Sequence, residues 1–397
     1  MKQYKHSICL MTCCFGEALL HRAAYFLKTA GWNSTVDFLV FSDQEAPASL
    51  PANVKFVQIS MADFNLLASE QLGMAIAVEQ IEKLKDFRPA YGKIFANHIQ
   101  GYDFWGHVDT DILLGDIREF LTAELLEETD VFTAREAFPA GYFTLYRNNS
   151  DTVDLFKQSA DWQKVFSNVA YLGFDEWGLT YQAYFNRRKL PQDNTSAIVS
   201  MADVLGRENI NLRVVRQPVS HELGFRELLE VNKEGIQRLG KEGRFMVIYF
   251  DVLNKQPSHV YEEIKAGDEQ FYIDVFGLLS CPSDTKLTVA ERDRQILEKS
   301  YAINFENVRM NDDGEVSIYV GNNEWFDVSK YILINTQFLL LINETKETTG
   351  NQIVDFFVAS QLFSIQKQVP PTRNDIELVL LNILCGLVEF GHLTILK

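Results

Sequence analysis

The sequence predicts an α/β protein of two domains: a large N-terminal domain around a buried parallel sheet, and a small α+β domain at the C-terminus. The chain has 397 residues, more than twice a typical domain of roughly 150 residues. Apolar runs alternate with helical patterns in the first half, which is typical of a parallel sheet buried on both faces. After residue 285 the pattern changes to short strands followed by helices.

Composition and charge exclude several classes of protein. Hydrophobic residues make up 47% and charged residues 23% of the chain, which excludes a disordered or low-complexity protein. The net charge of −17 disfavours nucleic acid and anionic membranes as partners, so a bound polyanion would need a basic pocket or a metal ion. No run of about 18 uncharged apolar residues is present, so we expect no membrane span. Residues 1–20 match a buried strand better than a secretory signal.

The cysteines indicate a reducing environment. They are odd in number and form no CxxC pair: Cys9, Cys13, Cys14, Cys281 and Cys385. We therefore expect neither a structural zinc site nor a disulfide framework, and we expect a cytoplasmic protein.

The first 43 residues have the order strand, helix, strand that opens a nucleotide-binding α/β sheet. An apolar run at 7–14 ends at Phe15-Gly16, a helical pattern covers 19–31, and a second apolar run covers 36–43.

The middle of the chain continues this alternation. Two helices are predicted at 75–87 and 92–101, separated by Arg88-Pro89 because proline ends a helix. An apolar strand at 102–108 then leads into a cluster of aspartates. The elements predicted after it are a helix at 117–129, strands at 130–134 and 141–148, helices at 152–166 and 175–185, and strands at 244–250 and 270–276.

A break in the pattern separates the predicted domains, 1–285 and 286–397. Proline, serine, aspartate and a run of charges replace apolar periodicity at 281–295. The elements predicted beyond it are strands at 304–310, 314–321 and 324–329, then helices at 336–344, 350–363 and 374–391. This winged-helix-like unit has no acid, base or metal constellation of its own, so we expect it to bind rather than to catalyse.

Asp109 and Asp111 are the strongest candidates for chemistry. They follow the strand 102–108 as Asp-Thr-Asp, and residues i and i+2 of an extended segment face the same side. Two carboxylates at the carboxyl end of such a strand lie where α/β sheets bind ligands, and they suit Mn²⁺ or Mg²⁺. Such a cation can bind the diphosphate of a sugar nucleotide and stabilise the leaving group. The alternative is a pair of solvated turn aspartates.

Five separated blocks resemble a family of bacterial GT-A glycosyltransferase-like proteins found with polysaccharide gene sets. The blocks are, in order, MTCCFG, VDFLVFSD, RPAYGKIF, YDFWGHVDTDILLGDIREFL and GYFTLYRN. The resemblance covers residues 5 to about 190 and implies a GT-A fold, a Rossmann-like nucleotide-diphospho-sugar transferase domain. It implies that Asp109 and Asp111 hold a divalent metal on a nucleotide-diphosphate sugar, with a UDP-sugar as the expected donor.

The same resemblance implies a donor site. Thr12, Phe15 and Gly16 match the first strand, which GT-A enzymes place against the nucleoside. Asp43 matches a position that often contacts the base, and its alternative is a turn or helix-cap residue.

Further site residues are implied beside the metal strand and after it. Tyr91 and Lys93 precede that strand, and Lys93 is either a phosphate ligand or a solvated helix lysine. Asp175 and Glu176 match an acidic position near the transferred sugar, with a helix cap as the alternative. His221 matches the place where several GT-A families supply a third metal ligand.

The C-terminal 98 residues, 300–397, resemble the PqqD-like fold, the leader-recognition element of ribosomal peptide-modifying systems. The resemblance rests on the block YILINTQFLLLINETKETTGNQIVDFF and a last helix ending before GHL. It implies that a peptide adds as a strand to the edge of the small sheet. The alternative is an accessory domain that packs on the enzyme or dimerises it.

These observations together predict a metal-dependent glycosyltransferase whose C-terminal domain recruits the acceptor, for example a leader-bearing ribosomal peptide. One alternative is an enzyme of cell-surface polysaccharide synthesis with a glycan acceptor. The other is a catalytically silent GT-A scaffold that binds a peptide or protein partner.

Overall fold

The computed structural model divides the chain into two compact units, which are described separately. The structure describes residues 4–16, 23–178, 198–222, 227–249, 269–274, 277–280, 288–298, 300–303, 308–310, 316–321, 324–327 and short segments from 348 to 395. Unit 1 consists of Met1–Glu222, Asn232–Ile236 and Arg244–Tyr249, and unit 2 holds the remainder. Among the described residues, no helix is both long and apolar enough to cross a bilayer.

A mixed sheet forms the centre of unit 1. Its strands are β1 (Ile8–Cys13), β2 (Asp37–Ser42), β3 (Val54–Gln58), β4 (Phe104–Val108), β6 (Val131–Thr133), β7 (Phe143–Arg147) and β8 (Val214–Arg216). The order across the sheet is β3-β2-β1-β4-β7-β6-β8. The first four of these are parallel, β7 runs antiparallel to both of its neighbours, and β8 is parallel to β6.

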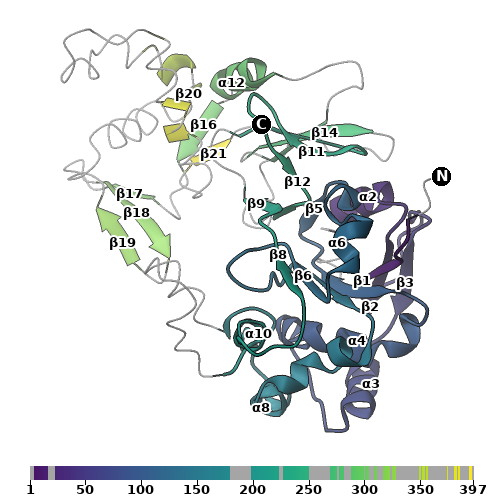
Figure 1. Ribbon diagram of the computed structural model, residues 1–397. Coiled ribbons are helices and arrows are strands. Elements are labelled where there is room, and N and C mark those ends of the chain that lie inside the picture. The colour runs from purple at the N-terminus through teal and green to yellow at the C-terminus, as the bar shows by residue number, and fades with distance from the viewer. Residues whose placement is uncertain are drawn as a thin grey trace. The chain divides into compact units, whose positions relative to one another are not determined.

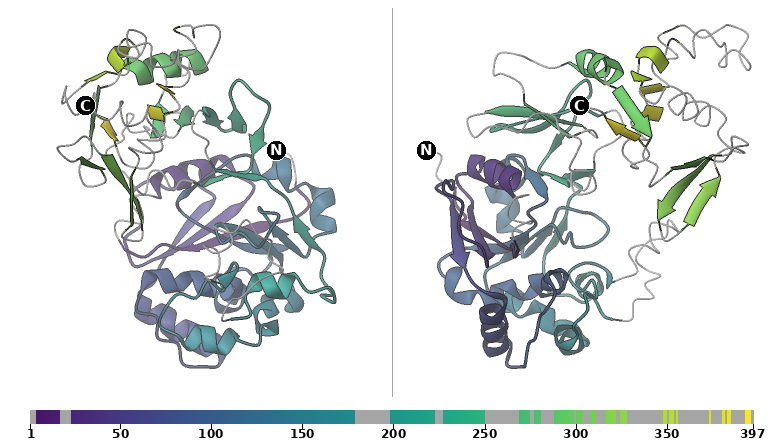
Figure 2. Two further views of the ribbon diagram at one scale, coloured as in Figure 1. Left: turned by 90° about the vertical axis from the view of Figure 1, so that its left-hand side faces the viewer. Right: turned by 180° about the vertical axis from the view of Figure 1, so that it is seen from behind.

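Helices cover both faces of this sheet, because side chains that alternate along a buried strand point into two separate cores. One core packs α2 (Ala24–Trp32), α5 (Ile117–Phe120) and α6 (Ala123–Glu127). The other packs α3 (Met61–Leu72), the 3₁₀ helix η1 (Ile81–Ala90), α4 (Tyr91–Ile94), α8 (Trp162–Ser167) and α10 (Met201–Leu205). Figures 1 and 2 show these helices on the two sides of the sheet. The predicted α/β class is confirmed.

Most of the predicted strands of the large domain are present, but the helices between them differ from the prediction. The helix predicted at 75–87 is wrong, since η1 starts later and continues through Pro89. η1 buries the charged side chains of Lys83 and Asp86, so hydrophobic periodicity could not define it. The predicted helix at 92–101 is reduced to the end of α4 and η2 (Ala96–His98). β3 and most of α3 were not predicted, although α3 begins at a Ser60–Asp63 capping box.

Two long predicted helices are broken into short ones. The helix predicted at 117–129 divides into α5 and α6 because Thr122 caps a new start by accepting from Leu125 N–H. The helix predicted at 152–166 is replaced by α7 (Ser150–Val153), η3 (Leu155–Gln158) and α8.

Unit 1 carries a second, smaller sheet beside the acidic turn that follows β4. β5 (Ile112–Leu114) pairs antiparallel with β13 (Val247–Tyr249), which pairs in parallel with β9 (Ser220–Glu222). The short strand β5 therefore leads away from the main sheet directly after the predicted metal ligands.

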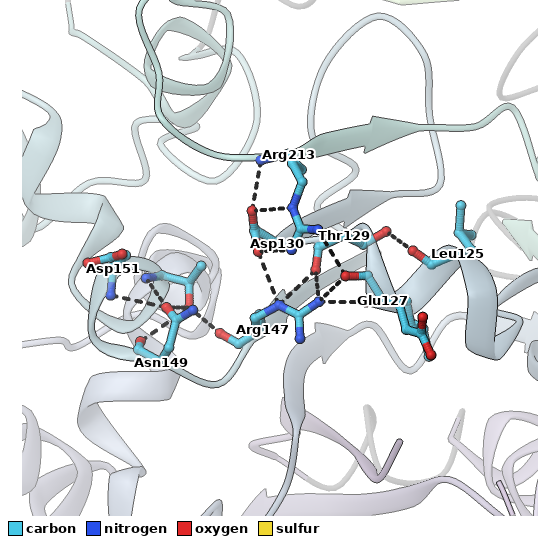
Figure 3. A network of polar contacts seen from close by, with 10 residues as sticks. Leu125, Glu127, Thr129, Asp130, Arg147, Asn149, Asp151 and Arg213 are labelled. Carbon is cyan, nitrogen blue, oxygen red and sulfur yellow. Dashed lines mark hydrogen bonds and ion pairs between the residues drawn. The ribbon is translucent and has the colours of Figure 1, made fainter. Parts of the chain in front are cut away.

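An ion-pair cluster ties three neighbouring strands of the main sheet together at one end (Figure 3). Asp130 precedes β6 and pairs with Arg147 Nε of β7 at 3.1 Å and with Arg213 Nη2, just before β8, at 2.9 Å. Arg147 also donates to the carbonyl oxygens of Leu126 and Thr129. The guanidinium therefore caps the C-terminus of α6 while it holds the sheet.

Unit 2 contains short antiparallel strands. The stretch 227–249, whose residues are divided between the two units, holds β10 (Leu229–Asn232), β11 (Gly235–Arg238) and β12 (Arg244–Phe245). Further along, β14 (Gln270–Asp274) pairs with β15 (Gly277–Ser280) in unit 2. β17 (Val308–Met310), β18 (Val316–Gly321) and β19 (Glu324–Asp327) form an antiparallel sheet. Three of the predicted C-terminal strands are thereby confirmed.

Other predictions for unit 2 differ or stay open. A second sheet of β20 (Thr348–Thr349), β16 (Ser300–Ile303) and β21 (Leu393–Ile395) was not predicted. A helix, α12 (Val289–Glu298), occupies the segment that we expected to be a break in the pattern. The predicted boundary near residue 285 and most of the three C-terminal helices lie outside the described residues and stay predictions.

Candidate functional site

The acidic turn after β4 holds the two aspartates of the predicted metal site. β4 is buried along its length because β1 and β7 pair with its two edges. The chain leaves the sheet at Asp109, whose N–H donates to Tyr142 O at 3.1 Å, and it bends before β5 begins at Ile112. Asp109 and Asp111 therefore lie in a bend at the carboxyl end of a parallel strand, where α/β sheets bind ligands.

Arg88, on η1, joins this turn to a second acidic segment. Its Nη2 donates to Asp109 Oδ2 at 2.6 Å and its Nη1 donates to Asp175 Oδ2 at 3.0 Å. The arginine is 8% exposed, so both contacts are shielded from water. Asp109 and Asp175 thus share one partner, the guanidinium of Arg88, which was not among the site residues predicted from the sequence. The signal for it was its place in RPAYGKIF, one of the blocks that carry the resemblance.

Asp175 and Glu176 lie in a turn that follows Gly173. The predicted helix 175–185 lies outside the described residues from 179 onward, and residues 174–177 form the turn. Asp175 is fully buried and its Oδ1 accepts from the Tyr171 hydroxyl at 3.1 Å. Glu176 Oε1 accepts from the Gly141 N–H at 2.8 Å. Both carboxylates are therefore held by long-range contacts.

Gly141 lies close to the side chains of Arg88, Asp175 and Glu176. A Cβ atom at this position would lie 2.8 Å from Asp175 Oδ2 and 3.0 Å from both Arg88 Nη1 and Glu176 Oε1. Real Cβ atoms essentially never approach a heavy atom within 3.0 Å, so a side chain here would have to displace at least the Asp175 carboxylate. Glycine lets the main chain before β7 pack against Arg88, Asp175 and Glu176 as they stand.

Arg88, Asp109, Asp111, Asp175 and Glu176 form what we call the charge cluster. Burial and neighbouring charges shift the pKa values of its acidic side chains in different directions. Burial raises the pKa of Asp111 to about 7, and the charge of Asp109 adds to this effect. Burial also tends to raise the pKa of Asp109, but Arg88 and then Lys85 outweigh it and hold the pKa below its usual range. Burial, with Glu176 and Asp86 and against the opposing effect of Arg88, raises the pKa of Asp175 to about 7. The cluster is therefore able to gain or lose protons near neutral pH.

Lys85 is a second cation at this cluster, and the sequence did not single it out. After the larger effects of burial and other neighbours, its charge helps to lower the pKa of Asp109 and opposes the burial that raises the pKa values of Asp111 and Glu176. Its ammonium lies 5.8 Å from the centroid of the Tyr171 ring. Lys85 Nζ pairs with Glu82 Oε1 at 2.8 Å, and since Glu82 is exposed and Lys85 is half-buried, this pair is partly open to solvent.

The four residues predicted to contact the nucleoside lie at the carboxyl ends of β1 and β2. Gly16 has a φ of 86° and its N–H donates to Asp43 Oδ1 at 2.7 Å, which closes the loop after β1 against the end of β2. Thr12 is 5% exposed and Phe15 is 1% exposed, so their side chains belong mainly to the core. Burial opposes the effect, but the Gly16 N–H and the Gln44 amide lower the pKa of Asp43. The nucleoside role of these residues stays a prediction.

Tyr91 and Lys93 point to other partners than the charge cluster. Tyr91 is 2% exposed and its hydroxyl lies 3.4 Å from Leu84 O. Lys93 Nζ lies 3.5 Å from Asp154 Oδ1, at the junction of α7 and η3. Burial and then Cys13 raise the pKa of Tyr91 against the effect of Arg88, and the charge of Asp109 adds to the rise. The donor role predicted for Tyr91 and Lys93 stays a prediction.

His221 lies in the small sheet that begins after Asp111. In that sheet Ile248 of β13 pairs with His221 of β9 on one side and with Leu113 of β5 on the other. Its ring stacks on Phe245 with centroids 4.3 Å apart and planes 12° apart. Within the described ranges, no three His, Cys, Asp or Glu side chains are gathered as a metal site. The set of Asp109, Asp111 and His221 stays a prediction, and Arg88 already occupies one oxygen of Asp109.

A family model matches residues 10–231, which is more than half of the chain and includes the whole charge cluster. The chain belongs to the family of unknown function DUF6625. The family segment contains the main sheet except for the first two residues of β1, and it also contains Arg88, the Asp109–Asp111 turn, the Asp175–Glu176 turn and His221. No curated protein matches the chain.

Comparison with solved structures returns glycosyltransferases at low similarity. One is a galactosyltransferase, LgtC, in complex with donor and acceptor sugar analogs, at 14% identity and a TM-score of 0.28, covering 49% of this chain and 85% of that one. Another is the glycosyltransferase GlyE of Streptococcus pneumoniae TIGR4, at 11% identity and a TM-score of 0.26, covering 54% of this chain and 45% of that one.

Proposed function

We propose that this chain is a metal-dependent glycosyltransferase that uses a nucleotide-diphosphate sugar, with a UDP-sugar as the expected donor. The observation that supports it best is the cluster of Arg88, Asp109, Asp111, Asp175 and Glu176 at the carboxyl end of β4. The sequence resemblance to GT-A proteins supplies the reaction class, and the geometry supplies residues able to perform it.

The acidic turn fits a hard divalent cation in part. Asp109 and Asp111 offer carboxylate oxygens, which Mn²⁺ and Mg²⁺ prefer, and diphosphate oxygens and water can complete such a shell. His221 is the proposed third protein ligand. When bound, the cation would stabilise the charge that develops on the leaving diphosphate.

The other charged residues divide into binding and proton-holding roles. Lys85 is a half-buried cation whose charge acts on these acids, and we assign it to the donor phosphates together with Lys93. Asp175 is buried, has a pKa of about 7 and lies beside the half-buried Glu176, so we assign the binding of sugar hydroxyls to Glu176 and the holding of a proton at neutral pH to Asp175. Arg88 keeps Asp109 ionised, as a metal ligand must be, and holds the Asp175 carboxylate in place.

Two acceptor classes and one silent alternative remain as proposals. A peptide would bind through the C-terminal domain, whose sheet has the edge strands β17 and β19. A cell-surface glycan would need no such domain. A silent scaffold would bind a peptide or protein partner without turning over the donor.

Donor hydrolysis by the full-length chain tests the proposal. We expect Mn²⁺-dependent release of UDP from at least one UDP-sugar in a panel. Asp111→Asn should reduce this release by about 100-fold, because an amide cannot supply the charge that offsets a cation.

The matched control is Asp151→Asn, an exposed aspartate of α7 outside the cluster, which should turn over the donor like the wild type. Wild-type turnover in Asp111→Asn would contradict the metal assignment. Absence of turnover in the wild type with every donor would favour the scaffold.

A further inference from the structure

A buried ion pair lies on η1 shortly before Arg88, outside the charge cluster, and the charge of its Asp86 acts on Asp175. The Lys83 and Asp86 side chains of η1 are both 0% exposed, and Lys83 Nζ lies 2.8 Å from Asp86 Oδ2. The ammonium also donates to Val165 O at 2.7 Å and to Ala170 O at 3.0 Å. All three donors of the lysine are thus used, two of them on the main chain of a distant segment.

The carboxylate of the pair binds the same segment from its other end. Asp86 Oδ2 accepts from Leu172 N–H at 2.9 Å, and Asp86 Oδ1 accepts from Phe174 N–H at 2.8 Å. Together the two charges hold the main chain at four points between 165 and 174. The next residue after this segment is Asp175.

Stability alone does not account for such a pair. Removing two charges from water costs several kcal/mol for each ion, and an apolar pair of similar volume is often equally stable or more stable. The hydrogen bonds of Lys83 and Asp86 are directional, and an apolar pair would not supply them. Their particular effect is to fix the path of one stretch of main chain.

Two side chains of η1, Asp86 and Arg88, therefore hold the turn that carries Asp175. Asp86 fixes the main chain at Leu172 and Phe174, and Arg88 binds the Asp175 side chain that follows. Gly173, between the two anchored amides, has a φ of 72°, a conformation that favours glycine. The position of the Asp175 carboxylate is set by these contacts together.

We propose that Lys83 and Asp86 are positioning residues, whose ion pair fixes the 165–174 segment so that Asp175 meets Arg88 within the proposed active site. We assign the pair no contact with substrate, and its proposed action is through the main chain of 165–174. The charge of Asp86 also acts directly on Asp175, so the cycle in the Asp86→Asn background, where that charge is absent, separates placement from direct charge. This inference builds on the proposed function, but its central claim, the placement of Asp175, can be measured without any turnover.

Lys83→Met in the full-length chain tests the claim through a thermal double-mutant cycle. Asp175→Asn is introduced into the wild type and into Lys83→Met, and the shift in melting temperature is compared. If Lys83 places Asp175 against Arg88, the shift caused by Asp175→Asn should fall by at least about half in the Lys83→Met background. Equal shifts in both backgrounds would overturn the proposal.

Turnover provides the second measurement. We expect Lys83→Met to lower kcat for donor hydrolysis by about 10- to 100-fold, with KM for the donor changed less than about twofold, because Asp109 and Asp111 are untouched. The matched control is Lys164→Met, which removes an exposed lysine paired with Asp161 at 4.0 Å on α8. The control should behave like the wild type in both measurements.

A second variant covers failure to fold. Asp86→Asn keeps one oxygen for a main-chain N–H and removes the charge, and the same cycle with Asp175→Asn applies to it. If Lys83→Met and Asp86→Asn are both unfolded, the pair serves the fold as a whole and the positioning role is rejected. If the wild type shows no turnover but the cycle shows coupling, the proposed function fails and the positioning claim stands.

Discussion

At the scale of single residues, Arg88 determines how charge is distributed in the candidate site. Its guanidinium contacts one carboxylate from each acidic turn, and both contacts are largely shielded from water. Removing one partner from such a buried arrangement leaves uncompensated charge, which is more damaging than replacing the whole set by apolar groups.

Arg88→Met should therefore lower the free energy of unfolding by about 3 kcal/mol, because Asp109 and Asp175 lose their shared counter-ion. Urea denaturation at pH 7 measures this. Arg207→Met, which changes an exposed arginine of the same unit, should alter the free energy by less than about 0.5 kcal/mol. Equal effects of the two substitutions would contradict the assigned role of Arg88.

Gly141 makes a second prediction at this scale. An alanine there must displace Asp175, Arg88 or Glu176, so Gly141→Ala should lower kcat for the donor by about 10-fold or more and reduce stability by about 1–3 kcal/mol. Gly101→Ala is the control, since its φ of 86° strains an alanine but its Cβ meets nothing within 4 Å. The control should lose about 1 kcal/mol of stability and keep its turnover.

Single residues also show what the sequence could and could not predict. Asp109, Asp111, Asp175 and Glu176 were found from short acidic motifs after apolar strands or a glycine turn. Arg88 was not, because its role depends on Asp175, which lies 87 positions away. No local pattern predicts that pairing.

At the scale of elements, strands were predicted better than helices. β1, β2, β4, β6 and β7 were all found, because each is a continuous apolar run in a sheet buried on both faces. η1 was missed as a 3₁₀ helix because its form depends on buried charged groups that contact distant main chain. The short helices α5 and α6 were merged because Thr122 is a cap whose effect is stronger than the hydrophobic period.

The Asp130 cluster gives a pH prediction for the sheet. Hydrogen bonds from Arg213 are the largest cause that lowers the pKa of Asp130 to about 2, below the unfolded value of about 3.9. Its stabilising effect is therefore complete above about pH 4 and is lost as the pH falls towards 2.

Asp130→Asn should lower the free energy of unfolding by about 1–2 kcal/mol at pH 7, and the difference from wild type should shrink as the pH is lowered to 3. Urea denaturation at the two pH values measures both quantities. A difference that stays constant across this range would show that the charge of Asp130 is not responsible.

At the scale of the whole molecule, the two units suggest a division of labour. The charge cluster lies wholly in unit 1, whereas the antiparallel sheet of β17, β18 and β19 belongs to unit 2. The α/β class of the large domain followed from the alternation of the sequence. The sheet of β20, β16 and β21 did not, because it joins strands from residues 300 and 393, which are far apart in the chain.

Truncation after residue 285, the predicted domain boundary, tests this division for the part of unit 2 that lies beyond the cut, while residues 250–285 of unit 2 are kept. The shortened chain should hydrolyse the donor at a rate within about twofold of the full-length protein, since every proposed donor and metal residue precedes the cut. With a peptide acceptor, KM should rise by about 10-fold or more if the removed part supplies binding energy. An unchanged KM would leave the C-terminal domain with a structural role.

The strand β8 has a consequence for how the protein folds and opens. It has only three residues, forms one border of the main sheet, and depends on Arg213 for its link to Asp130, 83 positions earlier. Closing so long a loop for so few backbone bonds is entropically costly, so this strand should dock late and detach early. Amide hydrogens of Val214 and Val215 should then exchange with solvent much faster than those of β1, and the first limited-proteolysis cuts should fall beside β8.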